Sequence, residues 1–103
     1  MSVLTEFSIF PTDNGESVSS YVGEVIRMVR EKCSCHLLTP MGTVIETDTM
    51  DEALEVLQKA NEILERQSGR IYCSANFDNR PGQSGRLEGK IRSIEEKIGK
   101  VNH

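Results

Sequence analysis

The chain has 103 residues, and its 12 Lys and Arg against 16 Asp and Glu give a formal net charge of -4. This length predicts one domain with a core of modest size, and the acidic balance disfavours nucleic acid and anionic membrane surfaces as partners. Because no apolar run approaches the length of a membrane span and the first residues lack a basic leader, we expect a soluble cytoplasmic protein.

The first part of the chain predicts a strand and then a helix. Residues 2–10 alternate between two unlike faces and end at Pro11, which is typical of a strand. After a polar turn, Ser17 is placed to cap a helix over residues 18–32. The apolar positions of this helix recur at helical spacing, and they are Val18, Tyr21, Val22, Val25, Ile26 and Val29.

The middle of the chain predicts a tight hairpin and a second helix. Two short β-prone runs, at about 35–39 and 43–47, are interrupted by the Pro-Met-Gly sequence at 40–42. Thr49 with Glu52 three residues later matches a capping box, which begins a helix. The apolar stripe expected on this helix consists of Leu54, Leu57, Ala60, Ile63 and Leu64.

The last part of the chain predicts a fourth strand over residues 70–78, a loop, and a C-terminal helix marked by Leu87, Ile91, Ile94, Ile98 and Val101. The order of elements is therefore βαββαβ plus a helix. Two split β-α-β units of this kind give an α+β fold of the ferredoxin-like class, with an antiparallel four-stranded sheet and both main helices on one face.

The sheet face that the two helices leave bare is expected to carry Leu4, Phe10 and Tyr72 among polar residues. Exposed apolar groups of this kind mark an interaction surface. We therefore expect a homodimer or a homotetramer assembled through this face.

The three cysteines, Cys33, Cys35 and Cys73, form an odd set, which favours reduced thiols over a disulfide scaffold. Together with His36 they could supply zinc ligands, but a one-residue gap is not the spacing of structural zinc sites, so no metal or other cofactor is expected. A catalytic pair of Cys35 and His36 is disfavoured as well, because adjacent strand residues point to opposite faces. No nucleophile and base are placed together, so the sequence does not predict an enzyme.

Two other functions of this fold class fit the sequence less well. Sheets that bind RNA carry aromatic residues on the central strands within a basic surround, whereas Glu6 and Asp78 would repel phosphate. The loop at 79–86 holds Arg80 and Arg86 between glycines, as an anion-binding loop could, but its composition is also that of an ordinary turn.

Polar side chains on three strands form the candidate site. The first and third strands are the central neighbours of this fold and the fourth lies beside the first, so their polar groups could converge. Carboxylates near hydroxyls and one arginine suit a cationic or amine-bearing heterocycle, and the alternative is a solvated polar face. The candidates are Glu6, Ser8, Thr43, Glu46, Asp78, Asn79 and Arg80.

Three segments carry a family resemblance: VLTEFSIFP near the start, PMGTVIET in the middle and RIYCSANFDNR toward the end. In this order and spacing they resemble the small thiamine-binding family that was long catalogued as a domain of unknown function. The most specific pieces are the MGT step at 41–43 with Glu46 three residues on, and the DNR step at 78–80. Many relatives have a second acidic residue at the position of Asn79.

The resemblance implies a ferredoxin-like protomer, sheet-mediated dimers often paired into tetramers, no established catalytic activity, and binding of thiamine or its pyrimidine part. Glu46 would be the principal ligand anchor, with Thr43 beside it, Asp78 supporting the charge and Met41 packing on a ring face. Residues 43 and 46 of a regular strand face opposite sides, so both reach one ligand only at a strand end or a bulge. The alternative function is a structural or regulatory oligomer without a physiological ligand.

Overall fold

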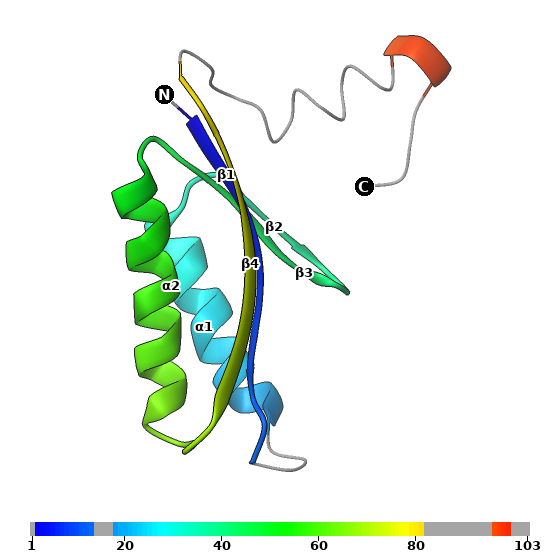
Figure 1. Ribbon diagram of the computed structural model, residues 1–103. Helices are drawn as coiled ribbons and strands as arrows, with labels where there is room; N and C mark the ends of the chain where they lie inside the picture. The colour runs from blue at the N-terminus through cyan, green and yellow to red at the C-terminus, as the bar shows by residue number, and fades with distance from the viewer. Residues whose placement is uncertain (1, 14–17, 82–95, 100–103) are drawn as a thin grey trace.

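The computed structural model describes residues 2–13, 18–81 and 96–99, with the backbone alone for 18–20. Two helices cover one face of a four-stranded sheet (Figure 1), which confirms the α+β, ferredoxin-like fold. Residues 96–98 are helical; the rest of the predicted C-terminal helix, the Ser17 cap and most of the 79–86 loop lie outside the described residues. In chain order the elements are β1 (Ser2–Pro11), α1 (Val18–Lys32), β2 (His36–Thr39), β3 (Gly42–Thr47), α2 (Met50–Glu65) and β4 (Ile71–Arg80).

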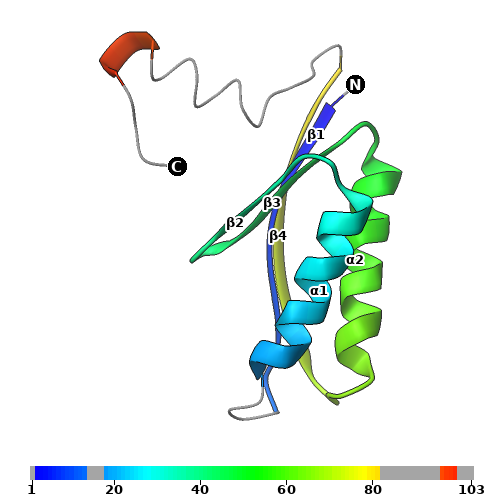
Figure 2. The ribbon, with the colours of Figure 1, turned by 180° about the vertical axis from the view of Figure 1, so that it is seen from behind.

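The four strands form one antiparallel sheet in the order β2-β3-β1-β4. β1 and β3 are thus the central pair, as predicted. β1 pairs with β4 over its full length, from Ser2 opposite Arg80 to Pro11 opposite Ile71. The β2–β3 hairpin diverges from α1 toward its tip (Figure 2).

The core lies between the sheet and the two helices. Alternate residues of β1, among them Val3 and Phe7, point into it, and Ile45 of β3 is fully buried beside them. These side chains contact the inward stripes of both helices. The buried cluster consists of Phe7, Val25, Val29, Cys33, Ile45, Val56, Ala60 and Leu64.

The start of α2 is confirmed, but its apolar stripe differs from the prediction. The Thr49 hydroxyl accepts a hydrogen bond from the Glu52 amide at 3.2 Å, as an N-cap residue does. Leu54, predicted to face the core, is 48% exposed. The helix is rotated so that the small residue Ala53 packs against the sheet instead, in line with Val56, Ala60 and Leu64.

The open face of the sheet, opposite the helices, is apolar at one end, as predicted. The rings of Phe10 and Tyr72 lie with their centroids 5.6 Å apart, and both are exposed. The prediction for Leu4 is wrong, because this residue is only 8% exposed. Leu4 sits on a central strand between Glu46 of β3 and Asp78 of β4, whose side chains flank it on the same face.

The end of β1 is held to the start of β4 by a cluster of polar contacts. The Asp13 carboxylate accepts hydrogen bonds from the Ser68 hydroxyl and from the Gly69 amide, the latter at 2.9 Å. Thr12 donates its amide to the carbonyl oxygen of Arg70 at 3.0 Å. The bond from Ser68, with those from backbone amides, holds the pKa of Asp13 below its usual value.

Candidate functional site

The turn between β2 and β3 is organised by the hydroxyl of Thr39. This oxygen accepts hydrogen bonds from the Met41 and Gly42 amides at 3.2 and 3.1 Å, and it donates to the Gly42 carbonyl at 2.9 Å. A side chain at Gly42 would begin 2.9 Å from the carbonyl oxygen of Phe7, so only glycine fits against β1. The turn therefore holds Met41, which is 83% exposed, at the tip of the hairpin.

A half-enclosed hollow of about 170 Å³, the hairpin pocket, lies between this turn, α1 and β1. Its walls are mainly apolar, and Thr43 reaches it from β3 although the residue is only 6% exposed. Among the residues that the structure describes, the Thr43 hydroxyl has no hydrogen-bond partner. The lining consists of Phe7, Ser8, Ile9, Val22, Val25, Ile26, Leu38, Thr39, Pro40, Met41, Gly42 and Thr43.

The open face holds the charged candidates. Glu46 is half-buried and accepts a hydrogen bond from the Ser2 hydroxyl at 2.6 Å. Glu46 and Asp78 lie on either side of Leu4, two strand spacings or about 10 Å apart. Glu6 lies two residues beyond Leu4 on β1, opposite Asn76, and Arg80 lies opposite Ser2. Register and strand alternation thus bring Glu6, Glu46, Asp78 and Arg80 to one face.

The structure divides the predicted site in two. β3 pairs regularly with β1 from Thr43 to Thr47, so Thr43 faces the helices while Glu46 faces the open side. The predicted arrangement of Thr43 beside Glu46 is therefore wrong within one protomer, because the sheet separates the two side chains. Thr43 and Met41 belong to the hairpin pocket, which Ser8 also lines.

The cysteines are placed as free thiols. Cys33 is buried, and Cys35 and Cys73 are exposed. Burial raises the pKa of the Cys33 thiol, and partial covering of the Cys73 sulfur raises the pKa of that thiol as well. Both thiols therefore stay protonated and weakly nucleophilic. His36 donates from Nδ1 to the carbonyl oxygen of Cys33 at 3.1 Å. The described residues contain no group of three His, Cys, Asp or Glu side chains that could hold a metal ion.

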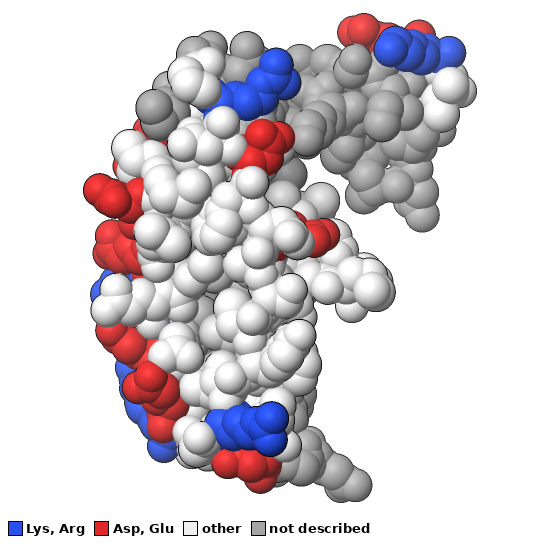
Figure 3. All heavy atoms as spheres, in the orientation of Figure 1, with Lys and Arg blue, Asp and Glu red and all other residues white. Residues whose placement is uncertain are grey.

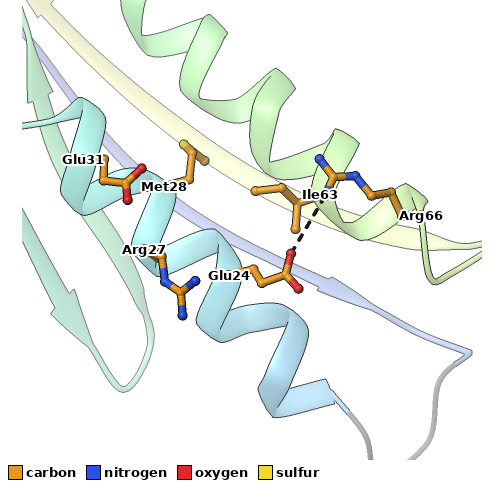
Figure 4. A pocket seen from close by; sticks show the side chains of 6 residues that line it. All are labelled: Glu24, Arg27, Met28, Glu31, Ile63 and Arg66. Atoms are coloured by element: carbon orange, nitrogen blue, oxygen red, sulfur yellow. Dashed lines mark ion pairs between the residues drawn. The ribbon is translucent and has the colours of Figure 1, made fainter.

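A second hollow, the α1–α2 groove, has a volume of about 420 Å³. Met28 and Ile63 face each other between the helices, and Glu24 reaches the Arg66 guanidinium at 4.0 Å (Figure 4). The charged groups on its rim are exposed and of both signs, so the groove has no net charge that would select a ligand. It is lined by Glu24, Arg27, Met28, Glu31, Ile63 and Arg66.

The comparisons with known proteins agree with this fold and with the sequence resemblance. A family model described as thiamine-binding protein matches residues 5–95, so the chain belongs to the thiamine-binding protein family. Its curated relatives carry the name UPF0045: those of Mycobacterium bovis and Mycobacterium tuberculosis are each 37% identical over 95 residues, which are 92% of this chain and 93% of theirs. The resemblance inferred from sequence is confirmed.

Solved structures show the same fold. A hypothetical protein of Methanocaldococcus jannaschii superposes with a TM-score of 0.79 at 31% identity, over 92% of this chain and 97% of that chain. A Thermotoga maritima protein with a provisionally ascribed role in thiamine biosynthesis or salvage gives 0.77 at 15% identity, over 91% and 99% of the two chains. No helix among the described residues is long and apolar enough to cross a membrane.

Proposed function

We propose that this protein is a non-enzymatic, cytoplasmic binding protein for thiamine or a related pyrimidine or thiazole compound, and that it works as a homo-oligomer. The observation that supports the ligand most directly is that Thr43 lines a small pocket and that its hydroxyl has no protein partner in the described part of the chain. Membership of the thiamine-binding protein family supports the ligand class.

The size of the hairpin pocket favours one ring of the ligand over the whole molecule. An apolar cavity of about 150 Å³ in another protein holds benzene, and this pocket has about 170 Å³. The aminopyrimidine ring would enter between Val22 and Ile26 of α1 and Leu38 of β2, with Met41 against its face. The rest of the molecule would extend into solvent, where the net charge of -4 favours a thiazolium cation.

Thr43 is the polar contact in this proposal. Its hydroxyl can donate to a ring nitrogen or accept from the exocyclic amino group. A threonine hydroxyl in the pocket wall that pairs with the ligand would distinguish an aminopyrimidine from an apolar ring of equal size. The open face is the competing location, where Glu46, Asp78 and Glu6 could hold a cation and Arg80 an anionic substituent.

Calorimetric titration with thiamine, its phosphates and the free pyrimidine tests the function. Thr43→Val keeps the shape of the side chain and removes one neutral hydrogen bond, worth about 0.5–1.5 kcal/mol, so affinity should fall roughly 2–10-fold. Glu46→Gln is the matched variant on the other face and should leave affinity within about twofold.

If Glu46→Gln weakens binding and Thr43→Val does not, the ligand binds on the open face instead. There the loss of a charge-assisted hydrogen bond at Glu46 costs about 1.5–3 kcal/mol, so affinity would fall by tens of fold. If the parent protein binds none of these compounds, the function is that of a structural or regulatory oligomer. A sedimentation profile showing only the 11.5 kDa monomer at micromolar concentration would contradict the oligomer.

A further inference from the structure

Met41 is the most exposed large apolar side chain among the residues that the structure describes, at 83%. It lies in the turn between β2 and β3, which projects from the side of the molecule (Figure 1), and the surface of this projection is uncharged (Figure 3). The other two described methionines, Met28 and Met50, are half-buried, and Met28 packs against the core. Of these three, Met41 is therefore the methionine that a small solute reaches most easily.

The turn fixes Met41 in this exposed place. The Thr39 hydroxyl accepts hydrogen bonds from the Met41 and Gly42 amides, and Gly42 lies against the carbonyl group of Phe7. A backbone change that turned the Met41 side chain inward would break these contacts. Met41 also lines the hairpin pocket, so the exposed side chain stands at the edge of that pocket.

A methionine at this edge provides chemistry that an aliphatic residue does not. Leu38 lines the same pocket, and a leucine at position 41 would cover a ligand ring with a similar apolar volume. The distinguishing group is the thioether sulfur, which is polarizable and which peroxides oxidise without a prior loss of a proton. A thiol reacts as the thiolate instead. Burial raises the pKa of the Cys33 thiol, and partial covering raises the pKa of Cys73, so these two thiols compete weakly for an oxidant.

We propose that Met41 is a modification site, at which a hydroperoxide oxidises the thioether to a sulfoxide and thereby weakens ligand binding in the hairpin pocket. In this step a lone pair on Sδ attacks the terminal peroxide oxygen, an S–O bond forms and the O–O bond breaks. The leaving oxygen takes up the proton of the transferred oxygen, so the sulfur is oxidised and hydrogen peroxide is reduced to water. The effect on binding rests on the proposed function, whereas the oxidation itself does not.

The sulfoxide changes the edge of the pocket because it replaces an apolar group with a polar one that needs hydrogen-bond donors. The Thr39 hydroxyl already donates to the Gly42 carbonyl at 2.9 Å, and Leu38 and Pro40 offer apolar side chains. The oxidised side chain is therefore solvated by water and no longer packs on the face of a bound ring. Conversely, a ligand that covers Met41 shields its sulfur from the oxidant.

Peptide mass spectrometry after brief treatment with hydrogen peroxide tests the modification. The peroxide is removed and dithiothreitol is added before digestion, so that disulfides and sulfenic acids of the cysteines are reversed while methionine sulfoxide persists. Met41 should gain oxygen about tenfold faster than the half-buried Met28. Equal rates at the two methionines would overturn the proposal, whether or not the protein binds thiamine.

Calorimetric titration with thiamine before and after the peroxide treatment tests the effect on binding. Affinity should fall about threefold or more, and methionine sulfoxide reductases should restore it. Met28→Leu and Cys35→Ser are the controls, and each should lose affinity on oxidation as the parent does. Met41→Leu should bind equally well before and after treatment, whatever its starting affinity.

Two results of this titration would overturn the proposal: an equal fall in Met41→Leu, or an unchanged affinity in a parent protein whose Met41 is oxidised. A parent protein that binds no thiamine before treatment contradicts the proposed function instead. In that case the mass spectra still decide whether Met41 is the site of modification.

Discussion

The two faces of the sheet differ in what their side chains contact, although the same strands supply both. On the helix-covered face, Phe7 and Ile45 are almost completely buried in a continuous apolar core, and Val3 is fully buried as well. On the open face, Phe10 and Tyr72 stay exposed and the acidic side chains lie in a row across three strands. Strand alternation therefore separates a buried apolar core from an exposed aromatic and acidic surface across the thickness of one sheet.

The largest effect is expected from truncation on the helix-covered side. Leu64→Ala should lower the free energy of unfolding by about 2–5 kcal/mol, because Leu64 is fully buried and the cavity left behind cannot collapse completely. Leu54→Ala on the same helix is the matched control and should change it by about 0.5 kcal/mol or less, since Leu54 is exposed. Urea unfolding measures both. Equal losses would show that the two sides of α2 do not differ as described.

A second test exchanges one hydroxyl for a methyl at two buried threonines of the same face. The Thr5 hydroxyl is fully buried and has no hydrogen-bond partner among the described residues, so Thr5→Val should raise the free energy of unfolding by about 1–3 kcal/mol. Thr47 donates to the Thr49 carbonyl at 2.9 Å, so Thr47→Val should lower it by about 0.5–1.5 kcal/mol. Thermal unfolding of both variants should show opposite signs, and a loss at Thr5 would mean that its hydroxyl has a partner.

The smallest effect on protomer stability is expected on the open face. Tyr72→Ala should cost about 1 kcal/mol or less, since the ring is 58% exposed and contacts mainly Phe10. The same change should weaken association through the open face, which sedimentation measures. Tyr72→Phe keeps the ring and should behave as the parent in both assays. A large loss of stability at low protein concentration would place Tyr72 in the core rather than on the exposed face.

The strands could be predicted from sequence because each has one buried face, which imposes a period of two. The segments at 2–10 and 70–78 were located in this way, and the structure extends them to Pro11 and Arg80. The start of α2 could also be predicted from nearby residues, because the Thr49 cap is formed by residues within one turn. Such features depend on neighbours in the chain, and the sequence displays those neighbours.

The burial of individual side chains between the buried and exposed sides of these elements could not be predicted. Leu54 lies within the broad apolar side of α2, and only the rotation of the helix against the sheet decides that Ala53 faces the core instead. Leu4 alternates to the open face, yet side chains from two other strands flank it. Each outcome depends on residues that are distant in sequence, which a periodic pattern does not contain.

The candidate site shows the same limit. Thr43 and Glu46 were correctly recognised as facing opposite sides of a regular strand, but whether a bulge brings them together is a property of the β1–β3 register. The hairpin pocket needs α1 to pack beside the turn, so Val22 and Ile26 could not be assigned to it from sequence. Thr39 was missed, although a threonine before Pro-Met-Gly is a recognisable signal for a side-chain-stabilised turn.

β3 has one further consequence, because it borders the hairpin pocket with Thr43 and the open face with Glu46 only three residues later. A ligand that displaces this six-residue strand from one side also moves the side chains presented on the other. If the proposed ligand enters the pocket and the protein assembles through the open face, binding and assembly are linked equilibria, and linkage is reciprocal. A ligand that tightens the contact across the open face by some factor is itself held more tightly, by the same factor, in the assembled protein.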